Sequence, residues 1–163
     1  MSKLTHVDAT GAANMVDVND KDATTRIASA SGHIYMSAET IDQILEHSNK
    51  KGDVLTTAKI AGIMGAKRCS DLIPLCHPLM LSKIEVTIDV EKEKSRLTVN
   101  AMCKLNGKTG VEMEALTAVS ITCLTLFDMC KASDPAMTIS DIKVLTKSGG
   151  KTGDWSYPKP IDS

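Results

Sequence analysis

IEVTIDV at residues 84–90 and LTVNAMCKL at residues 97–105 decide the fold of this chain. In both stretches apolar residues alternate with polar ones, which is the pattern of a β-strand with one buried face and one face in water. The charged residues EKEKS at 91–95 separate the two stretches and suit a turn. The sequence therefore predicts a β-hairpin over residues 84–105.

The segments on either side of this hairpin extend the pattern to a whole fold. They predict a strand at 26–35, helices that begin at Ser37 and Asp53, a long helix that ends at Lys131, and a last strand at 137–147. This order predicts an α+β fold, a ferredoxin-like β-α-β-β-α-β sandwich with an extra helix and an antiparallel sheet. Helices cover only one face of such a sheet, so we expect a partner chain and an oligomer.

The length of the chain is typical of a single domain. It has 163 residues, of which 42% are hydrophobic, and domains commonly hold about 100–200 residues. We expect one domain over residues 1–163, with 1–24 as a loosely ordered arm and 148–163 as a flexible tail. No run of about 18 apolar residues predicts a membrane span, and the acidic N-terminal segment does not resemble a secretory signal. We therefore expect a cytoplasmic protein without a membrane partner.

Aromatic residues are scarce, because Phe, Tyr and Trp together make up 2% of the chain, whereas Met occurs nine times. Proteins that bind single-stranded nucleic acid stack its bases on aromatic side chains, which are almost missing here. The net charge is −1 at pH 7, and this balance does not favour binding to a phosphate backbone. These features exclude nucleic acid as a partner and predict an aliphatic core.

Five cysteines are scattered through apolar segments, and no two of them form a Cys-x-x-Cys pair. That pair is common in zinc and iron–sulfur sites, so no metal site is expected. An odd number of cysteines is typical of reduced thiols in a cytosolic protein. Cys123 and Cys130 lie seven residues apart on a helical pattern and are predicted to be small core residues.

The triplet Gly-Lys-Thr occurs at 107–109 and again at 150–152. A nucleotide-binding P-loop needs another glycine five residues earlier, where this chain has Met102 and Leu145. Neither triplet is therefore a P-loop. Residues 107–110 precede the long helix, whose free N–H groups favour an anion, but a plain glycine-rich turn explains them equally well.

Charged residues begin and end the long helix. Glu112 and Glu114 in its first turn are readily explained as partners of the helix dipole. Asp128 and Lys131 are three residues apart near its end, which is the spacing of an ordinary surface ion pair. Asp128 stands in a largely apolar stretch, however. Partial desolvation there would move both pKa values toward neutrality and make a proton-transfer pair.

The spacing of Glu114 and Asp128 limits how they can share a site. The two are 14 residues apart, which leaves them only about 40° apart around a helix axis but roughly 21 Å apart along it. One small ligand cannot touch both carboxylates of a single helix. A site that uses both groups needs two chains and lies at a subunit interface.

Further cationic residues occur in loops rich in glycine or proline. His77 lies between two prolines, and Lys51 directly precedes a predicted helix start. A lone histidine is more often structural, and a lysine in a charged turn is more often simply solvated. Lys147 and its neighbours add positive charge near the C-terminus. Together these loops suit a compact polyanion such as a nucleoside triphosphate.

Six short motifs then indicate a family. They are MVDV at 15–18, KGD at 51–53, DLIPLCHPL at 71–79, GKTGVEMEALT at 107–117, DMCK at 128–131 and KSGGK at 147–151. On these motifs the chain resembles the molybdenum cofactor biosynthesis protein C family, the cyclic pyranopterin monophosphate synthases. The resemblance covers residues 3–155, and the motifs at 71–79 and 107–117 are highly specific.

The resemblance implies that the protein is an enzyme, and it implies which residues take part in catalysis and substrate binding. Members convert 3′,8-cyclo-7,8-dihydroguanosine triphosphate to cyclic pyranopterin monophosphate and release pyrophosphate, which makes them phosphorus–oxygen lyases. Asp128 matches the active-site residue of the family, while Lys51 and Lys131 match proton-shuttling lysines, with Glu112 nearby. The residues that match substrate-binding stretches are Leu75, Cys76, His77, Met113 and Glu114, and we add Lys147 as a candidate for phosphate binding.

The resemblance also implies a ferredoxin-like fold, a homohexamer built as a trimer of dimers, and a site between two chains. No cofactor or resident metal is expected, and the sequence leaves open whether Mg²⁺ accompanies the triphosphate. Two other classes fit the loops alone: a non-catalytic nucleotide sensor, which needs no Asp128–Lys131 pair, and a metal-dependent hydrolase, which a chelator would inactivate.

Overall fold

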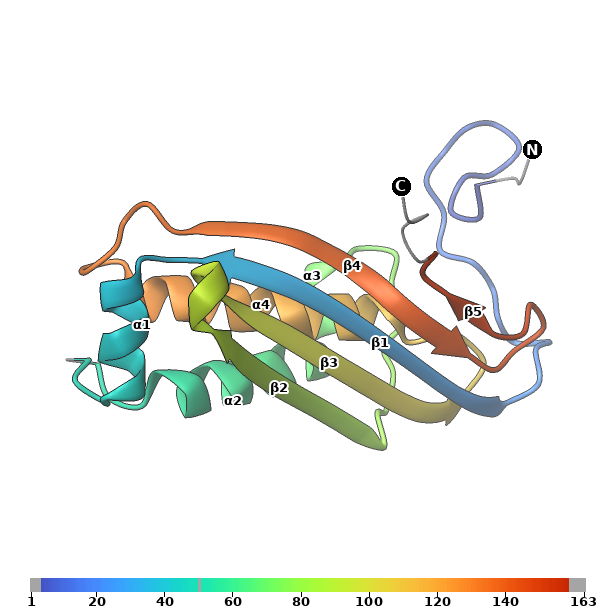
Figure 1. Ribbon diagram of the computed structural model, residues 1–163. Coiled ribbons are helices and arrows are strands. Elements are labelled where there is room, and N and C mark those ends of the chain that lie inside the picture. The colour runs from blue at the N-terminus through green and yellow to red at the C-terminus, as the bar shows by residue number, and fades with distance from the viewer. Residues whose placement is uncertain (1–3, 50, 159–163) are drawn as a thin grey trace.

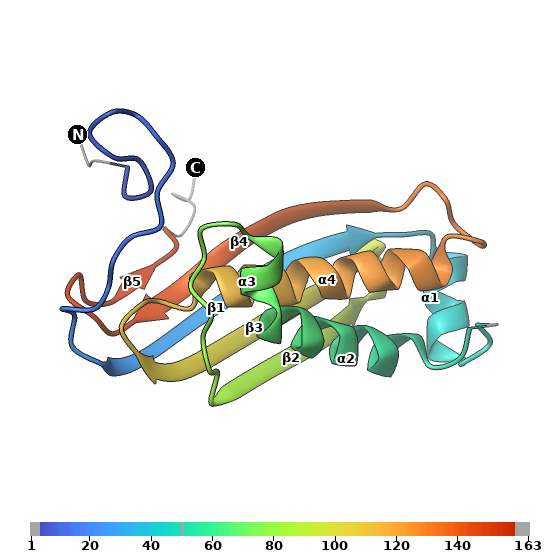
Figure 2. The ribbon, with the colours of Figure 1, turned by 180° about the vertical axis from the view of Figure 1, so that it is seen from behind.

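The computed structural model describes residues 4–49 and 51–158, which form one antiparallel sheet with helices packed on one face (Figures 1 and 2). The strand order is β2-β3-β1-β4-β5. The strands are β1 Thr24–Tyr35, β2 Lys83–Glu91, β3 Arg96–Gly107, β4 Thr138–Ser148 and β5 Trp155–Ser156.

Along the sequence, most of the helices lie between β1 and β2 or between β3 and β4. They are α1 Ala38–Leu45, α2 Val54–Lys67, α3 Cys69–Leu72 and α4 Glu112–Cys130, and a short 3-10 helix, η1, covers Lys92–Lys94. The order of the first four strands in the sheet, with α2 and α4 on one face, confirms the predicted ferredoxin-like α+β sandwich. The short strand β5, which pairs with Thr146 and Lys147 of β4, was not predicted.

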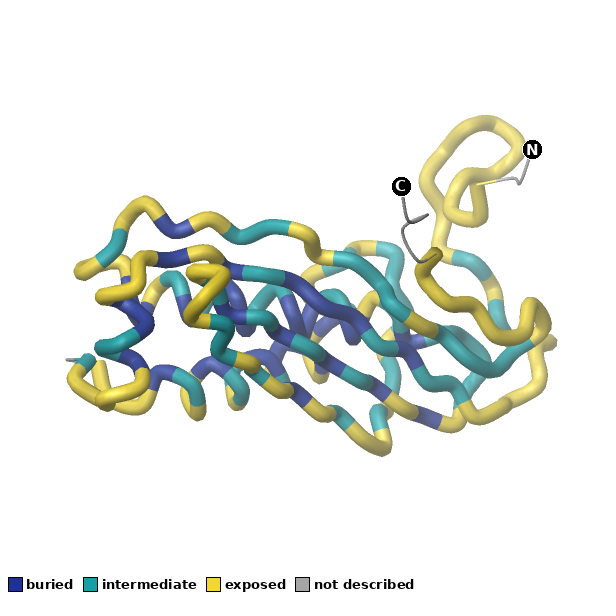
Figure 3. The backbone as a smooth tube through the Cα atoms, in the orientation of Figure 1, coloured by how far each residue is buried: buried dark blue, intermediate teal, exposed yellow. Residues whose placement is uncertain are grey.

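The hairpin that decides the fold forms in the register that its alternation requires. Val86 lies opposite Ala101 and Ile88 opposite Val99, so the apolar residues of β2 and β3 share one face. β1 occupies the centre of the sheet and pairs with both β3 and β4. The buried apolar residues of the described chain are aliphatic side chains, Met or Cys, which confirms the predicted aliphatic core (Figure 3).

The two predicted helix starts carry side-chain caps. The Ser37 side chain accepts a hydrogen bond from the Thr40 amide at 3.2 Å. Asp53 accepts one from the Thr56 amide at 3.0 Å. Each contact satisfies one of the free N–H groups of a first turn. The start of α2 is therefore well defined. Lys51 lies two residues before the capping residue Asp53.

α4 is the central helix of the molecule. By length and composition it is apolar enough to cross a membrane, yet half of the relevant window is buried inside the protein, as in a core helix. It lies across β1 and β3 and beside α2 (Figure 2). Its N-terminal end points toward the described part of the N-terminal arm, and its C-terminal end lies near α1.

Gly62 of α2 allows the two long helices to approach closely. A Cβ atom at this position would lie 2.1 Å from Thr122 Oγ1 and 2.9 Å from the Ala118 carbonyl oxygen of α4. Gly65, one turn later, would meet only the Ile121 side chain, at 2.7 Å. The contact of Gly62 with the Ala118 carbonyl involves backbone, so it is relieved only if the two helices move apart.

We therefore expect Gly62→Ala to destabilise the protein, although alanine is the better helix former by about 1 kcal/mol. Overpacking at such a site typically costs about 1–3 kcal/mol. Urea denaturation at a fixed protein concentration measures the change in the free energy of unfolding. Gly65→Ala is the matched control and should lose less, because a side chain yields more easily than a carbonyl. A Gly62→Ala protein as stable as the original would contradict this packing.

Candidate active site

The predicted site residues fall into two groups, one at each end of α4. Lys51, Asp128 and Lys131 surround its C-terminal end, which lies near α1. Most of the others surround its N-terminal end, beside the loop that follows α3. Glu114 and Asp128 belong to the same helix, so 14 residues of rise separate the groups by roughly 21 Å. A single chain does not bring the two groups together.

The C-terminal group is a cluster of one carboxylate and two amines. Lys51 Nζ lies 3.0 Å from Asp128 Oδ2 and donates to the Asp128 backbone carbonyl at 2.9 Å. Lys131 Nζ lies 2.8 Å from Asp128 Oδ1. The Asn49 side chain donates to the Met129 carbonyl at 3.0 Å, which ties the loop before α2 to the end of α4. The structure therefore adds Lys51 to the pair predicted from helical spacing.

The expected desolvation of Asp128 is wrong for the single chain. Its side chain is 57% exposed, and the flanking Lys131 and Lys51 lower its pKa from the ordinary aspartate value. Leu124, one turn earlier on the same side of α4, is 56% exposed as well. The apolar neighbours Leu126 and Met129 point into the core. Leu126 and Met129 are neighbours of Asp128 in sequence only, because they lie on the buried side of the helix, whereas Asp128 and Leu124 share the exposed side.

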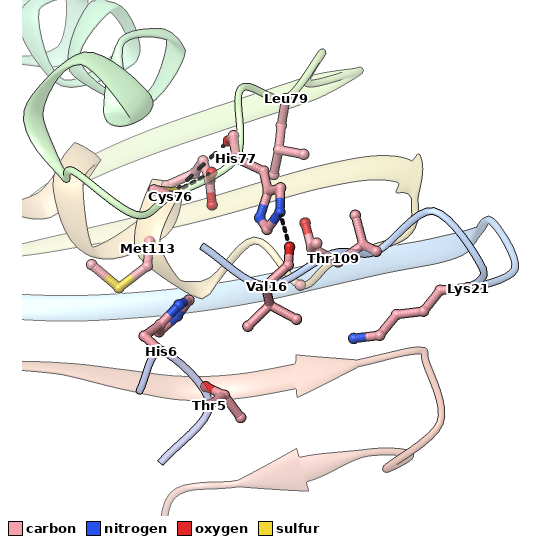
Figure 4. Close-up of a pocket in the computed structure, with 12 residues that line it drawn as sticks. Thr5, His6, Val16, Lys21, Cys76, His77, Leu79, Thr109 and Met113 are labelled. Carbon is pink, nitrogen blue, oxygen red and sulfur yellow. Dashed lines mark hydrogen bonds between the residues drawn. The ribbon is translucent and has the colours of Figure 1, made fainter. Parts of the chain in front are cut away.

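The N-terminal group lines an open cavity of about 230 Å³ (Figure 4). Cys76 and His77 enter it from the loop after α3, and Met113 and Glu114 from the first turn of α4. Leu75 precedes them in the loop but does not line the cavity. The prolines around this loop keep it out of regular structure, and residues 74–81 carry no helix or strand. The loop therefore holds its side chains against the start of α4.

The N-terminal arm forms the opposite wall of this cavity. His77 Nε2 lies 2.7 Å from the Val16 carbonyl oxygen, and Lys108 Nζ donates to the Asn19 carbonyl at 2.7 Å. Figure 4 shows the His77 ring directed at Val16. The arm was not predicted as part of the site. The motif MVDV at 15–18, which contains Val16, is the sequence feature that could have indicated it. The lining residues not predicted are Thr5, His6, Val16, Val18, Lys21 and Leu79, whereas Thr109 and Gly110 belong to the stretch 107–110 that was left open as an anion site or a plain turn.

Glu114 is a buried titratable group of the cavity, and the half-buried Cys76 lies beside it. Glu114 is 2% exposed, and its burial raises the pKa of its carboxyl group. Burial, with the charge of Glu114 next in importance, raises the pKa of the Cys76 thiol to about 12. Cys76 Sγ lies 3.6 Å from Glu114 Oε1 and 3.8 Å from Cys69 Sγ. Burial also raises the pKa of the Cys69 thiol.

Glu112 and Lys147 form a third contact beside the same end of α4. Lys147 Nζ of β4 lies 3.0 Å from Glu112 Oε1. Both residues line a small cavity of about 40 Å³, together with Arg26 of β1. Arg26 was not predicted, because an arginine at the start of a strand has no distinguishing pattern. It adds a second cation to the position where Lys147 was expected to bind phosphate.

Three buried polar side-chain atoms have no hydrogen-bond partner within the described residues: Arg26 Nε, Thr109 Oγ1 and Glu114 Oε2. All three belong to residues that line the two cavities at the N-terminal end of α4. Native proteins leave few buried polar groups unpaired, and those that remain call for a ligand, water or ion. All three atoms are therefore free to pair with water or with a polar ligand at this end of the molecule.

The fold and these contacts define the class of the protein. It is an α+β sandwich in which lysines, an arginine and a histidine from loops and strands lie at the two ends of one helix, together with a buried carboxyl group. Such an arrangement suits a small anionic ligand rather than a long polymer.

Comparison with known proteins identifies the family within this class. The model of the MoaC family matches residues 15–150, and the chain belongs to this family. Cyclic pyranopterin monophosphate synthases of Brucella ovis and Brucella abortus are 59% identical to it over 158 residues, which cover 97% of this chain and 96% of each relative. The synthase of Brucella canis is 58% identical over the same share.

Proposed function

We propose that this chain is a cyclic pyranopterin monophosphate synthase that acts in molybdenum cofactor biosynthesis. Its substrate is 3′,8-cyclo-7,8-dihydroguanosine 5′-triphosphate, and its products are cyclic pyranopterin monophosphate and pyrophosphate. The observation that carries the proposal is the 59% identity to synthases of that name over 97% of the chain. The unpaired atoms Arg26 Nε, Thr109 Oγ1 and Glu114 Oε2 support it, because a polar substrate bound at this end of α4 would give them hydrogen-bond partners.

The proposed reaction is that of a phosphorus–oxygen lyase. A hydroxyl oxygen of the substrate forms a bond to the α-phosphorus, the bond from that phosphorus to the bridging oxygen breaks, and pyrophosphate leaves. Negative charge develops on the leaving oxygens, and nearby cations stabilise it. Lys147 and Arg26 are placed for this role, because they line one cavity at the N-terminal end of α4.

Proton transfers accompany the opening and closing of the purine-derived rings. Asp128 with Lys51 and Lys131 is the proposed group for these steps, because both amines contact the carboxylate within 3.0 Å. General acid–base catalysis needs pKa values near the working pH. In the single chain Asp128 is exposed and its pKa is lowered, so the proposal requires that a second chain covers it.

Exposed apolar residues support such a second chain. Ile60 and Met64 on α2 and Leu124 on α4 are each more than half exposed, and α2 and α4 pack side by side. Leu124 lies one turn before Asp128 on the same side of the helix. We propose that a partner covers this face and sets the N-terminal group of its own α4 against Asp128, within a homohexamer built as a trimer of dimers.

The residues that line the 230 Å³ cavity favour recognition of the substrate by polar and aliphatic contacts. Phe, Tyr and Trp are absent from the described lining of the 230 Å³ cavity, so the ring system is held without aromatic stacking. Leu75, Cys76, His77 and Met113 are proposed to contact the substrate, with Glu112 and Glu114 as hydrogen-bond partners. We propose that no resident cofactor takes part, and that the protein acts in the cytoplasm, where its free thiols would stay reduced.

The decisive test uses the purified protein and its proposed substrate. Incubation with 3′,8-cyclo-7,8-dihydroguanosine triphosphate is expected to release one pyrophosphate for each cyclic product formed, as measured by a pyrophosphate assay and mass spectrometry. A nucleotide sensor would bind the substrate and release nothing. A metal-dependent hydrolase would stop when a chelator is added, and would yield a linear phosphate product. Either result would overturn the proposal.

A further inference from the structure

Three side chains that commonly bind metals meet beside the 230 Å³ cavity, which two of them, Cys76 and Glu114, line. Cys69 is the first residue of α3, Cys76 lies in the loop that follows, and Glu114 lies in the first turn of α4. Their ligand atoms all lie within 4.8 Å of one another. The cysteines are seven residues apart, so their spacing in sequence did not predict a site; the fold of the loop brings them together.

The distances between these atoms fit a tetrahedral cation. Cys69 Sγ and Cys76 Sγ are 3.8 Å apart, and Cys76 Sγ is 3.6 Å from Glu114 Oε1. A tetrahedral Zn²⁺ ion, with bonds of about 2.3 Å to sulfur and about 2.0 Å to oxygen, places two sulfurs about 3.8 Å apart and sulfur and oxygen about 3.5 Å apart. Two edges of such a tetrahedron are therefore present in the described structure, and the third pair, Cys69 Sγ and the Glu114 carboxylate, lies within 4.8 Å.

A second observation also points to a ligand at this position. Glu114 is 2% exposed, and its Oε2 atom is buried without a hydrogen-bond partner in the described chain. A buried carboxylate with an unpaired oxygen is costly, and a cation bound at its Oε1 atom would neutralise its charge and offset that cost. Thr117 Oγ1 lies 3.4 Å from Cys69 Sγ, so a hydroxyl group is placed to donate to that sulfur. Such outer contacts commonly orient metal ligands.

We propose that Cys69, Cys76 and Glu114 form a binding site for a thiophilic divalent cation of the Zn²⁺ type, with its fourth position open to the cavity. Two sulfurs and one carboxylate suit Zn²⁺ or Cd²⁺, whereas Mg²⁺ takes oxygen ligands in an octahedron. The site is therefore distinct from any Mg²⁺ that accompanies a triphosphate. A bound cation displaces the protons of both thiols. Because it then occupies Cys76 and Glu114, these two side chains can no longer contact the substrate.

Occupation of the site should then inhibit turnover, and this consequence alone rests on the proposed function. The cation binding itself depends only on the three side chains. Cys69 does not line the cavity, so its removal should abolish the metal site and leave the metal-free reaction unchanged.

The test uses the full chain, treated with a chelator, freed of metal and kept reduced with a phosphine. Cd²⁺ is added, and the ultraviolet charge-transfer absorption of cadmium–thiolate bonds is followed, with native mass spectrometry to count bound ions. We expect one Cd²⁺ per chain, displaced by Zn²⁺. Cys69→Ala should weaken binding at least about 100-fold, because losing even an outer contact costs 10–100-fold. Cys123→Ala removes a buried thiol outside the cluster and should bind like the original protein.

Two results would overturn the site: no cadmium–thiolate absorption in the original protein, or equal Cd²⁺ affinity in the original and Cys69→Ala proteins. Cys76→Ser is a second variant, which keeps the test valid if Cys69→Ala fails to fold. Cys76→Ser should also lose the cadmium–thiolate absorption. In the turnover assay, one equivalent of Zn²⁺ should inhibit the original protein and spare Cys69→Ala. A metal-free protein that binds Cd²⁺ but releases no pyrophosphate would contradict the proposed function and leave the cation site standing.

Discussion

Replacing Lys51 by alanine is expected to abolish formation of the cyclic product while the chain folds and assembles as before. Lys51 Nζ contacts both Oδ2 and the backbone carbonyl of Asp128, so its loss removes a proton carrier from the carboxylate. Loss of a general acid or base typically lowers the rate by about 10²–10⁴-fold. The stability of the single chain should change little, because this ion pair is exposed there and exposed ion pairs contribute little to stability.

The measurement is product formation under saturating substrate, with circular dichroism and the mass of the assembly as checks on folding. Lys67→Ala is the matched control, because Lys67 is an exposed lysine at the other end of α2. It should turn over substrate at the original rate. Normal turnover by Lys51→Ala would remove Lys51 from the proposed mechanism.

Mixing two inactive variants is expected to restore activity if two chains build each site. His77→Ala damages the group at the N-terminal end of α4, and Lys51→Ala damages the group at the C-terminal end. In a mixed dimer one site then carries both changes and the other carries neither. Random pairing makes half of the dimers mixed, so roughly a quarter of all sites should be intact.

The matched control mixes Lys51→Ala with Asp128→Asn, which damage the same group. Every site in that mixture contains a damaged group, so no activity should return. Co-refolded or co-expressed chains with different tags provide the mixed dimers, and turnover per site is measured. If the His77→Ala and Lys51→Ala mixture stays as inactive as its components, the site lies within one chain and the interface proposal is wrong.

Most of the fold could be predicted because its elements have strong periodicity. The alternation in β2 and β3 and the apolar length of α4 depend only on local sequence, and both were confirmed. β5 was missed because Trp155–Ser156 is too short to show a pattern. Its strand pairing with β4 is a contact between segments, and local periodicity carries no information about such contacts.

The candidate site was predicted less completely, for the same physical reason. Helical spacing identified Asp128 and Lys131, which do form an ion pair, but the apolar neighbours of Asp128 wrongly suggested its burial. The meeting of Cys69 with Cys76, and of His77 with Val16, depends on how loops fold back. Residues of the arm and tail at 1–3 and 159–163 lie outside the described chain, and the predicted disorder there stays a prediction.

The contact between His77 and the arm has a consequence for the chemistry of the ring. A carbonyl oxygen only accepts hydrogen bonds, so the 2.7 Å contact with Val16 places the hydrogen on Nε2. In the neutral ring Nδ1 then keeps its lone pair, and the arm selects the tautomer. Such a ring accepts a hydrogen bond from a hydroxyl or amino group of a ligand. The arm therefore decides which part of a substrate His77 can serve as a hydrogen-bond partner.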